Sequence, residues 1–216
     1  MMIYNLFLNI LISYLVGSLS GSLLLGKLKG VDIRKSGSKN AGGTNAFRTQ
    51  GFHFAICVVL IDISKGYISA NYISTLKLIH LNQVNNSELS LLMCGFAAII
   101  GHIYPIFYNF KGGKGAGTAV GMLFAIYPSS VLVAVISWLI ILISTGYVGL
   151  STIIGSITIP IQLQYSNHYF EYYHFFSIIL SFLIIFTHHG NIKRMIQGNE
   201  NQFKKVMVFK KLYNSS

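Results

Sequence analysis

The chain has 216 residues, of which 53% are apolar and only 10% are charged, and its formal net charge is +11. Soluble domains carry roughly a quarter charged residues, so this composition, with its repeated long apolar runs, excludes an ordinary soluble protein and indicates an integral membrane protein. The basic residues lie in the polar segments between the apolar runs, which argues against a nucleic-acid partner. Cys57 and Cys94 lie in different apolar runs without metal-ligand spacing, so neither a disulfide nor a metal site is expected.

Seven apolar runs are expected to form helices in a lipid bilayer. They cover residues 3–25, 52–76, 89–107, 115–127, 128–144, 147–165 and 172–186. The fourth run is shorter than the roughly 20 residues that a perpendicular membrane helix needs. The alternative is a single long tilted helix over residues 115–144, interrupted near Pro128.

The distribution of basic residues favours seven spans over six. With seven spans, fourteen of the sixteen Lys and Arg residues fall on one side of the membrane, whereas six spans would separate the basic C-terminal tail from the basic first loop. We therefore predict an all-α, seven-transmembrane-helix bundle with its N-terminus outside and its C-terminus in the cytoplasm. Residues 1–216 are expected to form one membrane-embedded domain, whose cytoplasmic segments are 26–50, 108–118, 145–149 and 187–216.

A glycine-rich stretch follows the third apolar run and reads Lys111-Gly112-Gly113-Lys114-Gly115. Glycine reaches positive φ without strain, so this stretch can turn several backbone N–H groups toward one point, and a helix that begins just after it adds its positive dipole end. We therefore expect the three glycines and Lys114 to cradle a phosphate group at the membrane surface. The alternative is a short basic loop that obeys the positive-inside rule.

The first polar segment, residues 26–50, is rich in Gly, Asn, Ser, Thr and basic residues. Arg34 and Arg48 supply guanidinium forks suited to phosphate oxygens, and Asn45 is a further candidate for phosphate binding. The alternative is an ordinary solvated loop, which has little need of so many glycines, asparagines and hydroxyl groups together.

Two ionisable residues, Asp62 and Lys65, lie in the second apolar run and share one face of a helix at i, i+3 spacing. Charges at membrane depth are costly and tend to be paired. A structural pair that braces the bundle is favoured, because the two charges neutralise each other; the alternative is a proton or substrate route. His102 precedes Pro105, and such a histidine often bonds carbonyls that a proline bend has freed.

The basic tail begins with His188-His189-Gly190-Asn191. A histidine at the membrane boundary can act as a base, donate to phosphate or be a plain surface residue. Two adjacent histidines are poorly placed as joint metal ligands, so we expect no zinc. The chain shows no Walker A motif, no Gly-x-Ser-x-Gly elbow and no His-x-x-x-x-Asp pattern. Anion-binding segments without a conventional nucleophile suit an enzyme that mainly positions two phosphorylated substrates.

Together these segments resemble the bacterial membrane-bound glycerol-3-phosphate acyltransferases that use acyl phosphate as donor. The resemblance rests on residues 32–48, 62–66, 101–118, 147–152 and 188–200, in the family's order. It implies a seven-helix bundle in the bacterial inner membrane with its active site facing the cytoplasm. It also implies transfer of an acyl chain from a long-chain acyl phosphate to the 1-hydroxyl of glycerol 3-phosphate, giving lysophosphatidic acid and phosphate. No cofactor and no coenzyme A donor are expected; an enzyme that produces acyl phosphate is the implied functional partner.

The resemblance also implies roles for individual residues. Ser38 and Arg48 match the Ser and the closing Arg of the first motif, Lys114 matches the Lys of the glycine loop, and His188 and Asn191 match the His-x-x-Asn of the tail. In the family these residues surround the two substrates. Arg48 and Lys114 would hold phosphate groups, while His188 and Asn191 would orient the attacking hydroxyl or the acyl carbonyl. Sequence alone does not decide whether His188 or a substrate phosphate oxygen takes the proton.

The chain departs from the family pattern at several positions. Lys39 replaces a glycine, and in the third motif Gly146 and Gly149 replace an Arg and a Ser. Thr152 keeps a hydroxyl at the second Ser of that motif and is therefore a candidate catalytic residue, and Ser151 is a partial substitute. Two other functions stay open: a carrier for an organic phosphate or another anion, and a homologue that binds phosphate or lipid but no longer turns over.

Overall fold

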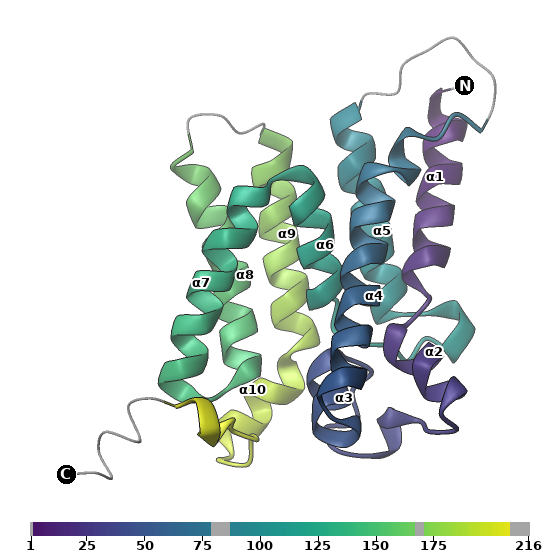
Figure 1. Cartoon of the computed structure of the whole chain (residues 1–216). Helices are drawn as coiled ribbons and strands as arrows, with labels where there is room; N and C mark the ends of the chain where they lie inside the picture. The colour runs from purple at the N-terminus through teal and green to yellow at the C-terminus, as the bar shows by residue number, and fades with distance from the viewer. Residues whose placement is uncertain (1, 79–86, 167–170, 208–216) are drawn as a thin grey trace. The chain divides into compact units, whose positions relative to one another are not determined.

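The computed structural model describes residues 2–78, 87–166 and 171–207, and it divides into two compact units, Met1–Tyr127 and Pro128–Ser216 (Figure 1). Throughout the described residues the regular elements are helices and none is a strand, which confirms the all-α prediction. Most of the polar segments that separate the second from the third and the sixth from the seventh apolar run, at 79–86 and 167–170, lie outside the described residues, as does the end of the predicted cytoplasmic tail at 208–216. That residues 1–216 form one domain stays a prediction.

The first unit is built on three neighbouring helices, α1 (Met2–Gly17), α4 (Phe52–Asn71) and α5 (Ser87–Ile103) (Figure 1). Helix α6 (Ala116–Ile126) packs on α4 and α5, while the short helices α2 (Gly21–Leu28) and α3 (Gly43–Gln50) contact α4. Short 3₁₀ turns connect the helices at Ile33–Lys35 (η1), Ile73–Thr75 (η2) and Ile106–Tyr108 (η3).

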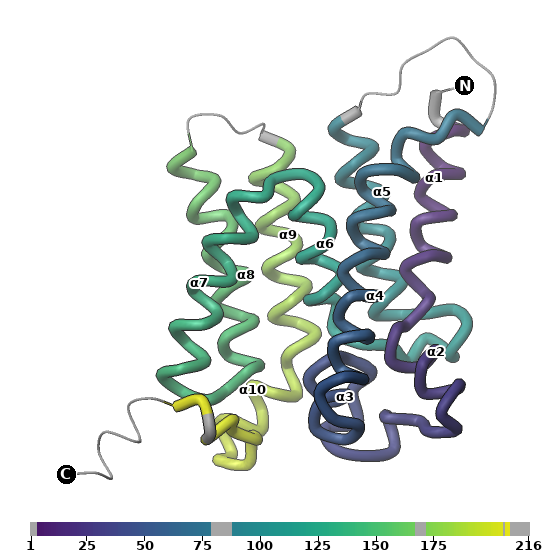
Figure 2. Tube along the Cα trace, viewed as in Figure 1, coloured from purple at the N-terminus to yellow at the C-terminus, as the bar shows by residue number. Residues whose placement is uncertain are grey.

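We expected the first apolar run to form one helix, and this prediction is wrong. It divides into α1 and α2, which are bent by 47° at the break, and Figure 2 follows the chain through this bend. The backbone N–H and the hydroxyl of Ser18 both donate to the Tyr14 carbonyl at 2.9 Å, and Ser20 adopts an extended conformation ahead of α2. Serine side chains that bond to the preceding turn compete with helix continuation, which accounts for a break inside an apolar run.

Glycines let the helices of the first unit approach closely. A Cβ on Gly66 of α4 would overlap the carbonyl oxygen of Thr118 in α6, and a Cβ on Gly121 of α6 would overlap that of Ile63 in α4. Gly101 of α5 meets the Tyr14 carbonyl of α1 in the same way. Small residues at helix contacts are the usual means of packing in membranes, where apolar burial gives little drive for helix association.

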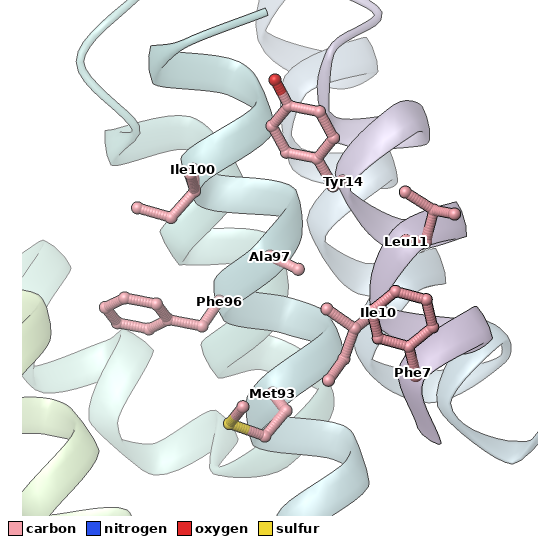
Figure 3. A pocket seen from close by; sticks show the side chains of 8 residues that line it. All are labelled: Phe7, Ile10, Leu11, Tyr14, Met93, Phe96, Ala97 and Ile100. Carbon is pink, nitrogen blue, oxygen red and sulfur yellow. The ribbon is translucent and has the colours of Figure 1, made fainter. Parts of the chain in front are cut away.

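An apolar groove of about 380 Å³ lies between α1 and α5 (Figure 3). Its lining consists of Phe7, Ile10, Leu11, Tyr14, Met93, Phe96, Ala97 and Ile100. The Tyr14 hydroxyl donates to the Tyr104 carbonyl at 2.8 Å, so the most polar group of the lining already has a partner. The groove therefore offers a surface for hydrocarbon and not for phosphate.

The second unit consists of α7 (Pro128–Thr145), α8 (Val148–Gln164), α9 (Glu171–Thr187) and α10 (His189–Ile196), followed by the 3₁₀ turn η4 (Lys204–Val206). Helix α8 contains Pro160, which cannot donate to the carbonyl of Ser156 one turn earlier. The Ser181 hydroxyl of α9 donates to this carbonyl at 2.7 Å. A neighbouring helix thus replaces the hydrogen bond that the proline removes, as is usual for proline inside membrane helices.

Three helices of the described chain are long and apolar enough to cross a membrane, and the number rises to five if each of two bent helix pairs is one span. The apolar helices α6 and α8 are shorter, with 11 and 17 residues. Helices α6 and α7 are separate, with α6 ending at Ile126 and α7 beginning at Pro128, rather than fused as in the alternative assignment. The count of seven spans and the orientation of the termini stay predictions.

Candidate active site

Asn45 organises the first polar segment. Its side chain is buried on α3, and its amide nitrogen donates to the carbonyls of Ile33 at 2.8 Å and Ser36 at 3.1 Å. Its amide oxygen accepts from the backbone N–H of Ser38 at 2.8 Å. Both N–H groups of Asn45 are therefore committed to the loop, so the structure gives this residue a different role from the phosphate contact we expected. It fixes the backbone that presents Ser38.

Arg34 joins the first polar segment to the glycine loop. Its guanidinium donates to Asp32 through Nε and Nη2, and through Nη1 to the carbonyls of Lys111 at 3.1 Å and Tyr108 at 3.4 Å. The hydrogen bonds from Arg34 lower the pKa of the Asp32 carboxyl below its ordinary value and raise the pKa of Arg34 itself. The fork that we assigned to phosphate on sequence grounds is thus used to hold two loops of the protein together.

The glycine loop closes the end of α5. The N–H groups of Gly112 and Gly113 donate to the carbonyls of Ile103 at 3.1 Å and His102 at 3.0 Å. These two N–H groups are therefore occupied inside the protein, which differs from the phosphate nest predicted for them. Glycine at position 112 instead lets the loop approach the end of α5 closely, because a Cβ on Gly112 would overlap the His102 carbonyl oxygen.

The remainder of the predicted cradle lies at the start of α6. Gly115 has φ +86° and is the N-cap of this helix, and Lys114 is partly buried directly before it. The first N–H groups of an α-helix have no partner within the helix, and its N-terminus carries partial positive charge. The phosphate site predicted at Lys114 and the α6 N-terminus is of a kind that binds anions, and it stays a prediction. Arg48, on α3, is also partly buried.

A buried charge cluster lies beneath this loop. Asp62 and Lys65 form an ion pair of 3.1 Å, and His102 joins it, with its Nδ1 at 2.8 Å from the Lys65 ammonium. The exposed fraction of each residue is 4% or less. The predicted pairing of Asp62 with Lys65 is confirmed; His102 was missed as the third member. The signal was available, because three ionisable groups in apolar runs are expected to find one another.

In the second unit, His188 is buried at the N-cap of α10. Its Nδ1 lies 2.8 Å from the carbonyl oxygen of Ile184. Since a carbonyl only accepts, Nδ1 carries the proton, and in the neutral ring Nε2 then has the lone pair. A role of His188 as a base stays a prediction.

Asn191 is held by a carboxylate that the sequence motif contained but to which we had given no role. The amide nitrogen of Asn191 donates to Glu200 Oε1 at 2.8 Å, and Arg194 Nε donates to Glu200 Oε2 at 2.6 Å. Asn191 and Glu200 are both buried. Glu200 thereby connects α10 to the segment that follows it and fixes the orientation of the Asn191 amide.

The third motif contacts the tail through its glycines. A Cβ on Gly149 of α8 would lie 2.8–2.9 Å from Asn191 atoms, so the side chain of Asn191 fills the space that the family's Ser would need. Gly146 has φ +72° and accepts a hydrogen bond from Phe203 N at 2.8 Å. The Thr152 hydroxyl donates to Val148 O and accepts from the Trp138 indole, so here it braces α8 against α7 rather than offering a hydrogen to a substrate.

The chain matches the glycerol-3-phosphate acyltransferase family over residues 7–198. A glycerol-3-phosphate acyltransferase of Chlorobaculum tepidum is 39% identical over 89% of this chain and 94% of its own length, and one of Chlorobium luteolum is 37% identical over 88% and 93%. A solved structure of PlsY (YgiH), an integral membrane glycerol 3-phosphate acyltransferase in its glycerol 3-phosphate form, has 34% identity and a TM-score of 0.81, covering 92% of this chain and 95% of that one. The structure of its lysophosphatidic acid form has 33% sequence identity to this chain and a TM-score of 0.79.

Family match, sequence identity and structural similarity agree over nearly the whole length of the chain. This protein belongs to the glycerol-3-phosphate acyltransferase family, a class of integral membrane acyltransferases of phospholipid synthesis. Among the described residues, no group of three or more His, Cys, Asp or Glu side chains could hold a metal ion.

Lys39 supplies a direct test of the loop geometry. It has φ +59°, a left-handed conformation that costs a residue with a Cβ roughly 1–2 kcal/mol. The family resemblance places a glycine here. We expect Lys39→Gly to raise the free energy of unfolding by about 1 kcal/mol, seen as a higher thermal midpoint in detergent. Lys39→Ala removes the same charge but keeps the Cβ, so its midpoint should not rise; equal midpoints for the two variants would contradict the assignment.

Gly149 tests the contact with Asn191. Gly149→Ala should displace the Asn191 side chain from Glu200 and lower the free energy of unfolding by about 1–3 kcal/mol. The matched control is Gly190→Ala, also in a helix, where the new Cβ would have Arg194 Nη1 as its nearest neighbour at 3.5 Å. Alanine there should leave the thermal midpoint unchanged or slightly raised. The contact is refuted if the Gly149 variant melts at the wild-type temperature.

Proposed function

We propose that this protein transfers an acyl group from a long-chain acyl phosphate to the 1-hydroxyl of sn-glycerol 3-phosphate and forms lysophosphatidic acid and phosphate. The observation that carries the proposal is the family match over residues 7–198, together with the similarity to PlsY structures in glycerol 3-phosphate and lysophosphatidic acid forms. We place the reaction at the cytoplasmic face of the bacterial inner membrane, because the predicted topology gathers the basic loops there.

Binding of the phosphorylated substrates falls to the first unit. Lys114 supplies a point charge beside the N-terminus of α6, and Arg48 supplies a planar fork that matches phosphate oxygens. Ser38 adds a hydroxyl on the backbone that Asn45 fixes. The hydrogen bonds from Arg34 to the carbonyls of Lys111 and Tyr108 keep the two loops together, so the binding groups are in place before substrate arrives.

The chemistry falls to the second unit in this proposal. The substrate hydroxyl oxygen attacks the acyl carbonyl carbon, the bond from that carbon to the phosphate oxygen breaks, and phosphate leaves. The hydroxyl proton goes to His188 Nε2 or to a phosphate oxygen of the substrate. Asn191, held by Glu200, orients the hydroxyl or the carbonyl. The reaction needs no cofactor, because acyl phosphate is itself an activated donor.

The test is an assay of purified protein in lipid vesicles with acyl phosphate and labelled glycerol 3-phosphate. We expect labelled lysophosphatidic acid without coenzyme A, and no product when acyl-coenzyme A replaces acyl phosphate. A result with acyl phosphate intact and no product would refute the proposal. In that case, uptake of organic phosphate into sealed vesicles would indicate that the protein is a carrier. Binding of phosphate or lipid without turnover would indicate a non-catalytic homologue.

Lys114 and Lys111 provide a matched pair in one loop. Lys114→Ala should raise the KM for a phosphate substrate by about 10- to 100-fold or abolish turnover, because a hydrogen bond to a charged group is worth about 1.5–3 kcal/mol. The Lys111 side chain is exposed, and Lys111→Ala should change KM far less. Wild-type kinetics for the Lys114 variant would remove the phosphate cradle from the mechanism.

A further inference from the structure

We propose that Lys65, buried in α4, positions the glycine loop through the ring of His102, so that these two residues act as positioning residues for phosphate binding. The inference rests on the proposed function for its kinetic consequence, but the contact it describes is independent of the reaction. No motif assigns this role, and the sequence alone favoured a simple brace between Asp62 and Lys65.

The Lys65 ammonium is saturated by three acceptors. Its Nζ lies 3.1 Å from Asp62 Oδ1, 3.1 Å from the carbonyl oxygen of Leu19 and 2.8 Å from His102 Nδ1. An ammonium has three N–H donors and accepts nothing, so each donor has one partner. Asp62 alone already balances the charge of Lys65, and His102 is therefore not needed for neutrality.

The ammonium fixes the tautomer of His102. Nδ1 of the His102 ring lies 2.8 Å from the Lys65 ammonium and 3.3 Å from Asp62 Oδ1. Because a charged Lys65 only donates, the shorter of the two contacts requires Nδ1 to accept, and the neutral ring then carries its proton on Nε2. His102 has an exposed fraction of 3%, so the ring cannot reach water to turn freely. Lys65 thus sets both the orientation of the ring and the atom that bears its proton.

The opposite edge of the ring contacts the glycine loop. A Cβ built on Gly113 would overlap His102 Nε2 and would lie 2.9 Å from Cε1 and 3.0 Å from the carbonyl oxygen of Ala41. Gly113 is therefore enclosed between the histidine ring below it and the first polar segment beside it. Glycine is required here by this close approach and not by a positive φ, which Gly113 does not have.

The position of Gly113 decides where Lys114 lies. Lys114 is the next residue, and Gly115, the N-cap of α6, follows it. The α5 end of the loop is fixed by the hydrogen bond from Gly113 N to His102 O. A shift of the ring therefore moves the groups that we assign to phosphate binding, and displacements of about 1 Å at such groups can cost on the order of 100-fold in rate.

Two substitutions of His102 test the contact of Nδ1 with Lys65 and the contact of Nε2 with Gly113 separately. In His102→Asn, the amide oxygen replaces Nδ1 as the acceptor for Lys65, but no atom reaches the position of Nε2. In His102→Gln, the amide reaches the Gly113 side but leaves Lys65 without its third acceptor. We expect the Asn variant to keep its thermal midpoint and to raise the KM for glycerol 3-phosphate about tenfold. The Gln variant should melt lower and keep a KM closer to that of the wild type; the reverse pattern would overturn the proposal.

A double-mutant cycle tests the contact itself. Gly113→Ala in the wild-type background places a methyl group against Nε2 and should lower kcat/KM and the thermal midpoint. In the His102→Asn background the methyl group has room, so the same change should cost at least threefold less in kcat/KM and less in midpoint. Equal costs in both backgrounds would overturn the proposal. His53→Asn, at an exposed histidine at the start of α4, is the control and should leave both quantities unchanged.

The thermal midpoints keep this inference separate from the proposed function. If wild-type protein makes no lysophosphatidic acid, the reaction is refuted, and the cycle of midpoints still decides the contact between His102 and Gly113. If the wild type is active and the midpoints and kinetics of the cycle are additive, the reaction stands and the positioning role is overturned.

Discussion

A single ammonium group that must find three acceptors away from water is the constraint on which the first unit depends. Lys65 takes those acceptors from three elements, because Leu19 lies at the break between α1 and α2, Asp62 lies on α4 and His102 lies on α5. Asp62 in turn accepts from the backbone N–H of Gly21 at 3.3 Å. A buried charge without partners would cost several kcal/mol, so the helices are fixed where these groups meet.

The bend between α1 and α2 exposes two of the backbone groups that the buried charges of α4 bind. A continuous helix would use the carbonyl of Leu19 and the N–H of Gly21 in its own hydrogen bonds. The break at Ser18–Ser20 releases both groups, and side chains of α4 bind them. The same rule operates in the second unit, where Pro160 frees the Ser156 carbonyl and Ser181 binds it. Irregular backbone in an apolar setting persists where another part of the protein satisfies it.

Sequence reasoning could predict the helices, because apolar runs and the polar segments between them are local signals. It could also predict that Asp62 pairs with Lys65, since their spacing places them on one helix face. It missed the α1–α2 break, because the partners of the freed backbone groups are more than 40 residues away in the chain. His102 lies on a different helix, 37 residues from Lys65, so no spacing along one helix indicated that it joins the cluster; the only signal was an ionisable group in an apolar run.

Residue type alone did not indicate the contacts that the candidate site residues make. The motifs located the loops, but residue type does not tell which donors are already used within the protein. Asn45, Arg34 and the N–H groups of Gly112 and Gly113 all have donors suited to phosphate, and the fold commits them to carbonyls or to Asp32. Gly149 was recognised as a departure from the family pattern, but the side chain of Asn191 against it could not be inferred from the sequence.

The most direct test of the account is an experimental structure of the protein in lipid with glycerol 3-phosphate bound. We predict the substrate phosphate within hydrogen-bond distance of Lys114 and Arg48, near the N-terminus of α6, with the His102 ring between Lys65 and Gly113. Phosphate bound away from Lys114 and Arg48, or a His102 ring turned away from Gly113, would contradict the account.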